Sequence, residues 1–168
     1  MKYSSAFNSA VRAAVLGFLA LGLSSTSAFA ATATANFNVT ATVSATCIVS
    51  ATALSFGSYT GAVANAQSSV NVTCTNTSPY DVGLNAGLTT GATVTTRQMG
   101  IVQPAGGLNY GLFSDSGHAT NWGNTAGSWV HGVGSGAQQT LTVYGQVPAG
   151  QYVTPGSYTD TIIATVNY

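Results

Sequence analysis

Hydrophobic and polar residues alternate along most of the chain after residue 30, which is the two-residue period of a strand with one buried face. No stretch of this region carries a helical period. The alternating runs, named by their first and last apolar positions, are Phe37 to Val43, Val70 to Cys74, Val82 to Ala86, Leu108 to Leu112, Leu141 to Val147 and Tyr158 to Tyr168. Strands with one dry and one wet face are typical of antiparallel sheets. The pattern therefore predicts an all-β chain, with roughly six to eight short strands in an antiparallel sandwich.

Turn-forming residues separate these runs. Gly, Pro, Ser and Asn gather at 76–79, 87–96, 104–107, 114–136 and 148–156. The stretch 114–136 is the longest, and we expect it to be irregular. There is no internal repeat and no linker that would divide this region into two domains.

The first thirty residues have the pattern of an export signal. Lys2 and Arg12 precede an apolar run at 13–23, and Ala28-Phe29-Ala30 forms a small-x-small cleavage site. The apolar run is too short for a transmembrane helix, which needs roughly 20 residues. We therefore predict a cleaved signal peptide at 1–30 and a mature chain that begins at Ala31.

Charge is scarce in the predicted mature chain, where Arg97 is the only Lys or Arg and three aspartates are the only acids. A single cation cannot neutralise a row of phosphates, which excludes nucleic acid and anionic lipid as electrostatic partners. We expect Arg97 to pair with Asp115 or Asp160, because its guanidinium suits a bidentate carboxylate. The alternative is an exposed arginine.

Cys47 and Cys74 are the only cysteines. In an exported protein such a pair most often forms a disulfide, which we predict here. A metal or redox pair is the alternative, but neither cysteine lies in a C-x-x-C motif and no histidine is near either one.

No motif for catalysis or metal binding is present in the sequence. His118 and His131 both lie in the stretch 114–136, and a zinc or catalytic site would need further ligands or a positioned nucleophile. We therefore expect a protein that is not an enzyme and needs no cofactor and no metal. Trp122, Trp129 and Tyr110 could form a platform that stacks on sugars, or they could pack in the sandwich or at an interface.

The two ends of the mature chain suggest contacts between copies. The segment 31–44 has a strand pattern but precedes the region closed by the cysteines, and the sequence stops at Tyr168 inside another strand pattern. A spare strand and a bare sheet edge are what strand donation between chains requires. Pairing of the first strand within its own domain explains the same pattern, and periodicity does not choose between the two.

Several short motifs occur in an order that resembles a known family. They are Cys47, Leu54-Ser55-Phe56-Gly57, Val72-Thr73-Cys74, Arg97-x-Met99, Leu108-Asn109-Tyr110-Gly111-Leu112-Phe113-x-Asp115, Trp122-Gly123, Gln139-Thr140-Leu141-Thr142-Val143-Tyr144-Gly145, Val147-Pro148 and Pro155-Gly156-Ser157-Tyr158-Thr159-Asp160-Thr161. Together they resemble the spore coat protein U domain, which is also the subunit fold of archaic, Csu-type chaperone–usher pili.

The resemblance implies an incomplete immunoglobulin-like sandwich that a strand from a neighbouring subunit completes. On this sequence the donor strand is 36–43, with Phe37, Val39, Ala41 and Val43 facing inward. The C-terminal strand, through Ile162, Ala164, Val166 and Tyr168, forms one wall of the acceptor groove and contacts the chaperone. The implied domains are a signal peptide at 1–30, a donor segment at 31–44 and a pilin-like sandwich at 45–168.

The resemblance also implies the function and the partners. The chain is expected to be a structural subunit of a bacterial surface pilus, exported through the periplasm and supporting adhesion and biofilm formation. Its partners would be other copies or related subunits, a periplasmic chaperone and an outer-membrane usher. The alternatives are a secreted spore-coat-type structural protein and a surface-binding adhesin.

Overall fold

The computed structural model describes residues 30–101 and 106–168, and the predicted signal peptide lies almost wholly outside them. Within these ranges every assigned element is a strand, and no helix is long and apolar enough to cross a membrane. The strands are β1 (Cys47–Ala51), β2 (Ala64–Cys74), β3 (Pro79–Leu84), β4 (Arg97–Ile101), β5 (Gly106–Phe113), β6 (Val130–Val133), β7 (Gln138–Val147) and β8 (Ala164–Asn167).

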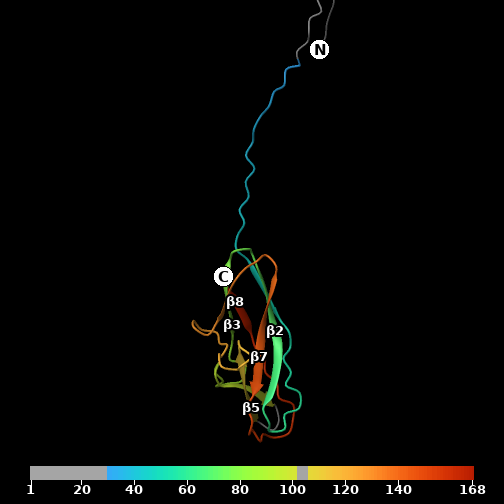
Figure 1. Ribbon diagram of the computed structural model, residues 1–168, viewed down its shortest axis with the longest axis vertical. Coiled ribbons are helices and arrows are strands. Elements are labelled where there is room, and N and C mark those ends of the chain that lie inside the picture. The colour runs from blue at the N-terminus through green and yellow to red at the C-terminus, as the bar shows by residue number, and fades with distance from the viewer. Residues whose placement is uncertain (1–29, 102–105) are drawn as a thin grey trace, which may run out of the picture. The chain divides into compact units, whose positions relative to one another are not determined.

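The strands form two antiparallel sheets (Figure 1). The larger sheet has the order β1-β2-β7-β5-β4, and the smaller one has the order β6-β3-β8. The longest pairing joins β2 to β7, from Ala64 opposite Val147 to Thr73 opposite Gln138. The predicted all-β antiparallel architecture is confirmed.

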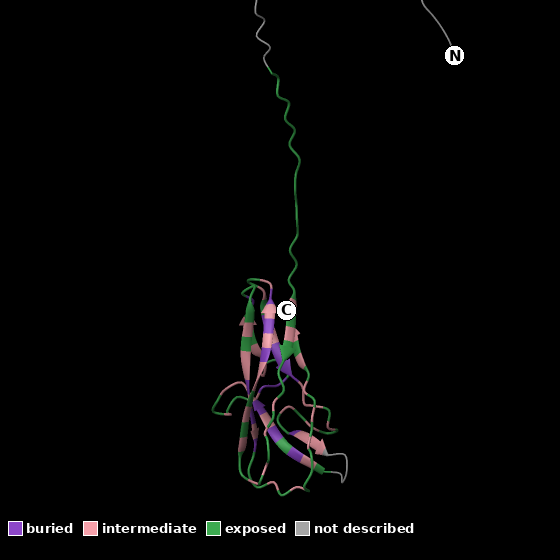
Figure 2. Ribbon diagram, turned by 90° about the vertical axis from the view of Figure 1, so that its right-hand side faces the viewer, coloured by how far each residue is buried: buried purple, intermediate pink, exposed green. Residues whose placement is uncertain are grey.

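One side-chain layer between the sheets forms the core (Figure 2). The larger sheet contributes the inward positions of β2, β5 and β7, and the smaller sheet contributes those of β3. The buried apolar residues are Val70, Val72, Cys74, Tyr80, Val82, Leu84, Leu108, Tyr110, Leu112, Trp122, Val143 and Val147. Most of them are apolar positions of the alternating runs, because a two-residue period places every second side chain on one face of a strand.

Three strands, β1, β4 and β6, lie outside the predicted alternating runs, and β2 begins at Ala64 rather than at Val70. β6 falls inside the stretch 114–136 that was expected to be irregular. These segments are short or polar, and pairing with a distant strand stabilises them as strands. The run from Phe37 to Val43, in contrast, is not a strand in the structure, and its residues are exposed.

The disulfide between Cys47 and Cys74 is confirmed. The two residues are directly opposite in the β1–β2 pairing, with Cα atoms 4.1 Å apart. The bridge therefore ties the edge strand β1 to its neighbour β2.

Replacing both cysteines with serine should destabilise the domain. Closing a loop over a sequence separation of 27 residues is worth roughly 3–4 kcal/mol in the chain-entropy account. Denaturant melts of the double variant measure the loss. As a control, the intact mass of the unmodified exported protein should lie below the dithiol mass by two hydrogen atoms, and a free dithiol would contradict the prediction.

Candidate functional site: an open groove between two sheet edges

A groove opens where the edges of the two sheets face each other. β1 is the last strand of the larger sheet and β8 is the last strand of the smaller sheet, and each pairs with a neighbour on one side only among the described strands. Between the segment that follows β1 and the segment that leads into β8 lies a cavity of about 390 Å³. Its wall residues include Leu54 and Phe56 on one side and Thr161 and Ile162 on the other.

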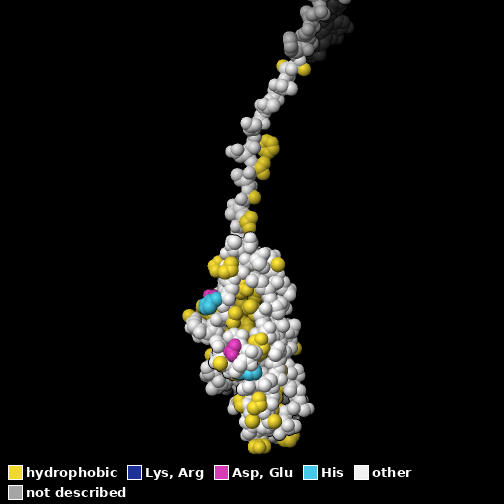
Figure 3. Space-filling view, viewed as in Figure 1, with side chains coloured by type: hydrophobic (Ala, Val, Ile, Leu, Met, Phe, Trp, Pro, Cys, Tyr) yellow, Lys and Arg dark blue, Asp and Glu magenta, His cyan; other side chains and the backbone are white. Residues whose placement is uncertain are grey.

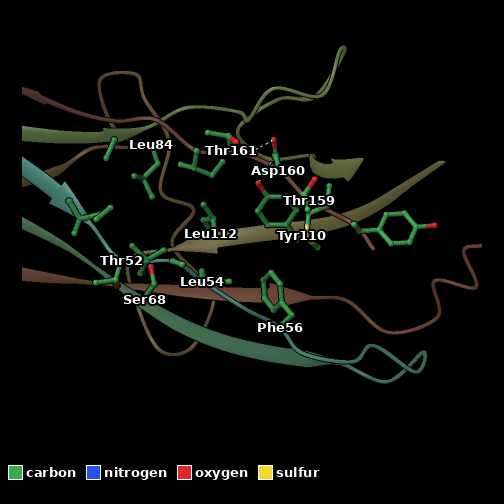
Figure 4. Close-up of a pocket in the computed structure, with 18 residues that line it drawn as sticks. Thr52, Leu54, Phe56, Ser68, Leu84, Tyr110, Leu112, Thr159, Asp160 and Thr161 are labelled. Atoms are coloured by element: carbon green, nitrogen blue, oxygen red, sulfur yellow. Dashed lines mark hydrogen bonds between the residues drawn. The ribbon is translucent and has the colours of Figure 1, made fainter. Parts of the chain in front are cut away.

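Core side chains form the floor of this groove (Figure 4). In this view Tyr110 and Leu112 of β5 lie between Leu54 and Phe56 on one wall and Asp160 and Thr161 on the other. Val70, Leu84 and Val143 also reach the cavity. These floor side chains are themselves buried, so the groove reaches down to the core of the domain.

The groove continues into a second cavity of about 690 Å³. The two cavities share Leu54, Phe56, Met99 and Tyr158, and the second adds Tyr59 and Val153 at its far end. Together they form one long trough that runs between residues 51–61 and 151–164. Figure 3 shows hydrophobic side chains gathered in a recessed strip on the face that carries β8.

The backbone along the trough offers unpaired hydrogen-bonding groups. Ile163 bonds to Asn85, through its carbonyl to the amide of Asn85 and through its amide to Asn85 Oδ1. Because backbone groups alternate in direction along a strand, Ala164 and Val166 point their amides and carbonyls away from β3, toward the open edge. That edge can accept another strand.

A glycine allows one wall to lie against the larger sheet. Gly145 of β7 faces inward, and a Cβ atom there would meet Leu54 at 2.8 Å and Phe56 at 2.9 Å. Any side chain at this position would push Leu54 and Phe56 outward. Gly145 therefore keeps this wall of the trough seated on the sheet.

A carboxylate is built into the other wall. Asp160 accepts hydrogen bonds from the hydroxyl of Tyr110 at 2.6 Å and from the amides of Leu88 and Thr161, each at 2.8 Å. Burial and the hydrogen bond to Asp160 together raise the pKa of Tyr110, so this hydroxyl stays protonated as a donor. These bonds hold the start of the C-terminal segment against β5.

The predicted ion pair of Arg97 is wrong. Arg97 is fully buried, and its guanidinium donates hydrogen bonds of 2.7–2.9 Å to four backbone carbonyl oxygens, those of Leu84, Asn85, Val94 and Trp122. Asp115 instead accepts bonds from the amides of Ala119 and Thr120. The guanidinium has five N–H donors, which can bind separate carbonyl oxygens as well as a carboxylate. Because every residue carries a backbone carbonyl, the sequence held no signal for these partners.

The charge of Asp160 still acts on Arg97 from a distance. Burial lowers the pKa of Arg97 from 12.5 to about 10, while electrostatic interactions with Tyr110 and Asp160 oppose that fall. Arg97 is therefore a buried cation whose direct partners are all neutral.

The other candidate residues do not form a site together. Trp122 is buried and donates its indole N–H to the carbonyl of Val82, and Tyr110 is buried beneath the groove, so the sugar-stacking platform that includes these two rings is wrong. Trp129 is half-buried. His131 contacts Asp81 on the outer face of the smaller sheet, and no group of three or more possible metal ligands occurs in the described ranges.

The predicted groove residues divide between two environments. Ile162 and Ala164 line the first cavity, whereas Val166 packs against the core and Tyr168 is 62% exposed. The segment Leu54 to Phe56 forms the opposite wall. It was noted in the sequence only as part of a family motif, and it is not a strand in the structure.

The predicted donor residues are exposed. The side chains of Phe37, Val39 and Val43 are 86%, 83% and 83% exposed, and Ala41 is also exposed. By its internal contacts the chain divides into Met1–Thr40 and Ala41–Tyr168, so this run spans the end of one unit and the start of the next.

Comparison with known proteins identifies the family. The family model of the Spore Coat Protein U domain matches residues 33–165. The chain belongs to this family. Protein U of Myxococcus xanthus is 36% identical in an alignment 155 residues long that covers 83% of this chain and 87% of that protein. The family resemblance predicted from the ordered motifs is confirmed.

A solved structure of similar fold is the complex described as a "CsuC-CsuE chaperone-tip adhesion subunit pre-assembly complex from archaic chaperone-usher Csu pili of Acinetobacter baumannii". One chain of that complex matches with a TM-score of 0.56 and 27% sequence identity, over 76% of this chain. This member of the Spore Coat Protein U domain family spans 40% of that longer chain. The fold is thus shared with a protein of the chaperone–usher system.

Proposed function

We propose that this protein is a structural subunit of a surface fibre of the chaperone–usher class, assembled by strand donation from copy to copy. The observation that carries the proposal is the open trough over the core, bounded by two sheet edges. The same chain carries an exposed segment whose apolar residues recur at every second position from Phe37 to Val43. A groove that lacks a strand and a strand that lacks a sheet complement each other.

The trough and the segment 36–43 are chemically complementary. The trough presents apolar core side chains between two edges with unpaired backbone groups, so an occupant must be an extended strand with one apolar face. In the segment 36–43 the other face consists of Asn36, Asn38, Thr40 and Thr42, which can remain in water. Periplasmic passage, a chaperone that occupies the same groove first, and an usher as the assembly platform belong to this proposal, and so does a location on the cell surface.

The energetics favour a fibre that does not dissociate readily. Full burial of a large apolar side chain contributes about 1.5–3 kcal/mol, so Phe37, Val39 and Val43 would together contribute roughly 5–9 kcal/mol before ordering costs. Strand hydrogen bonds add about 0.5–1.5 kcal/mol each. The inserted strand would also pack on the core side chains that form the floor of its neighbour's groove, which stabilises that domain.

Removing residues 31–44 tests the proposal. The truncated protein should accept a synthetic peptide of sequence 31–44 but should not form polymers, because it has a groove and no donor. Electron microscopy and size-exclusion chromatography measure polymer length, and a thermal shift on adding peptide measures occupation of the groove. The proposal fails if the truncated protein still forms fibres, or if it is as stable alone as with peptide.

The matched control supplies the donor in cis. Grafting residues 36–44 after Tyr168 through a flexible linker should give a stable monomer, since the graft fills the groove of its own chain. A graft with Val39 and Val43 changed to Asp should not stabilise the domain, because each charge would enter an apolar groove.

A coat-type structural protein is the second candidate. The match to Protein U over 87% of that protein favours it, because that relative is also close to the length of this chain. Electron microscopy of the cell surface discriminates between the candidates. Thin fibres that disappear on deletion of a chaperone or usher gene support the pilus, and a continuous sheath that persists supports the coat.

We further propose that the fibre supports attachment to surfaces and biofilm formation. Its nearly uncharged surface would approach other surfaces without strong electrostatic repulsion. Loss of attachment in a strain that lacks this protein, restored by the intact chain but not by the chain without residues 31–44, is the supporting result. Unchanged attachment would contradict it.

A further inference from the structure

The outer face of the larger sheet carries an aromatic cluster that the groove does not use. Phe113 of β5 lies directly opposite Tyr144 of β7, with both side chains on the face away from the core. The His118 ring stands edge-on between them, 5.3 Å from the Phe113 ring and 6.5 Å from the Tyr144 ring. All three side chains are half-buried. Phe113 and Tyr144 thus form a shallow platform, and the His118 ring stands perpendicular to both of them.

The loop after β5 is built to hold His118 in this position. His118 has a φ of 54°, a conformation that few residues other than glycine adopt. Asp115 stabilises the turn, because its carbonyl accepts the amide of His118 and its carboxylate accepts the amides of Ala119 and Thr120. Those amide bonds lower the pKa of Asp115, so the carboxylate stays ionised and bonded to the loop backbone.

A glycine flattens the sheet beside the cluster. The ring of Phe113 lies over Gly111, where a Cβ atom would approach that ring to 2.6 Å. Gly111 therefore lets the ring lie along the strand rather than stand up from it. Phe113 therefore presents a ring that lies along the sheet, on which the apolar face of another ring can stack.

Amide side chains surround the platform. Gln146 donates to Asn65 Oδ1 at 3.1 Å, and Gln98 donates to Asn109 Oδ1 at 3.0 Å. Each pair leaves an NH₂ group and an amide oxygen with no partner among the described residues. Gln67, opposite Tyr144 in the β2–β7 pairing, adds another amide to the same face.

Among the described residues, the one charged side chain beside this face is Asp115, in the loop that holds His118. The charged side chains of the described ranges are Arg97, which is buried, and three aspartates. Asp160 belongs to the groove, Asp81 contacts His131 on the other sheet, and Asp115 is bonded to its own loop.

We propose that the surface formed by Phe113, His118, Tyr144, Gln67, Gln146 and Asn65 binds an uncharged saccharide. A sugar ring has an apolar face that stacks on aromatic rings and a rim of hydroxyl groups that exchange hydrogen bonds with amides. It also carries no charge that an uncharged protein face would have to neutralise. A protein or nucleic-acid partner would need apolar burial or cations, and this face provides neither in quantity.

Co-sedimentation of the exported full-length chain with polysaccharides tests the proposal. Insoluble cellulose and chitin are the neutral probes, soluble dextran is a neutral competitor, and alginate and heparin are the charged probes. At least one neutral polysaccharide should retain the protein. Because no ion pair is involved, retention should stay the same between about 0.05 and 0.5 M salt. Retention only on charged polymers, or on none, would overturn the proposal.

Variants assign the binding to this surface. Phe113→Ala and Tyr144→Ala should each weaken retention by about tenfold, the loss of one stacked ring. Tyr152→Ala is the matched control, since Tyr152 is 91% exposed and lines the trough rather than this face, and it should bind saccharide like the unchanged protein. Gln146→Ala removes only a surface amide and should remain folded. If Phe113→Ala melts early, weaker retention by Gln146→Ala still separates loss of binding from loss of stability.

Two further outcomes would contradict the proposal. Equal loss of retention in Tyr152→Ala would mean that the contact is not at this face. Lateral bundling of fibres without saccharide that Tyr144→Ala abolishes would mean that a second copy covers the face instead. Because this surface lies on the outer face of the larger sheet and shares no residue with the groove, a failure here leaves the proposed fibre assembly untouched.

Discussion

Replacing Arg97 with methionine is expected to lower the free energy of unfolding by about 4 kcal/mol or more. The variant keeps the apolar stem but leaves four carbonyl oxygens without their donor. A buried acceptor that loses its only partner costs about 1–3 kcal/mol, and loss of the buried charge recovers part of the total. This loss is a large fraction of the roughly 5–15 kcal/mol that is typical of a whole domain, so the variant should be poorly folded.

Arg97→Lys separates charge from hydrogen bonding. Lysine keeps the positive charge, but its compact ammonium cannot reach carbonyls as far apart as those of Val94 and Trp122 at once. We therefore expect an intermediate loss of stability. Urea melts of the chain carrying the grafted donor segment measure all variants in the same completed domain.

Asp160→Asn is the control for the ion pair that the sequence suggested. If Arg97 depended on this carboxylate, Asp160→Asn would cost as much as Arg97→Met. In the structure Asp160 contacts Tyr110, Leu88 and Thr161, and an asparagine oxygen can still accept from the two amides. We expect a clearly smaller loss. A change of less than about 1 kcal/mol for Arg97→Met would contradict the buried role of Arg97.

Inserting one glycine between Val39 and Thr40 is expected to abolish polymer formation. The side-chain period of a strand is two residues, so one extra residue turns every later apolar side chain to the opposite face. Phe37 and Val39 would then enter the groove only if Ala41 and Val43 faced water. The roughly 5–9 kcal/mol available from the inward set would be divided between two incompatible registers.

A second insertion provides the matched control. One glycine between Ser44 and Ala45 adds the same residue outside the donor run and leaves its internal period intact. This variant should polymerise, since only the connection to β1 is lengthened. Polymer length by electron microscopy compares the two. Fibres of equal length from both insertions would contradict a donor strand with a fixed inward face.

The two-residue period alone identified the inward faces of the main strands. Val70 and Val72, Leu108 to Leu112, and Val143 and Val147 were predicted as apolar faces and are buried in the structure. These predictions succeed because the period of a strand is a local property of the chain. The disulfide was also predictable from the sequence, because two cysteines in an exported chain leave only one possible pair.

Tertiary structure alone decided how the segments that lack a strong pattern are placed. Edge strands such as β1 and β6 form because distant residues supply their partners, and no local pattern records that. The trough exists because residues 52–61 and 153–163 pass each other without pairing, which depends on where two sheets end. Arg97 illustrates the same limit most directly. Its type and position predicted a carboxylate partner, but its donors are satisfied by backbone carbonyls, which every residue carries and which only the fold brings within reach.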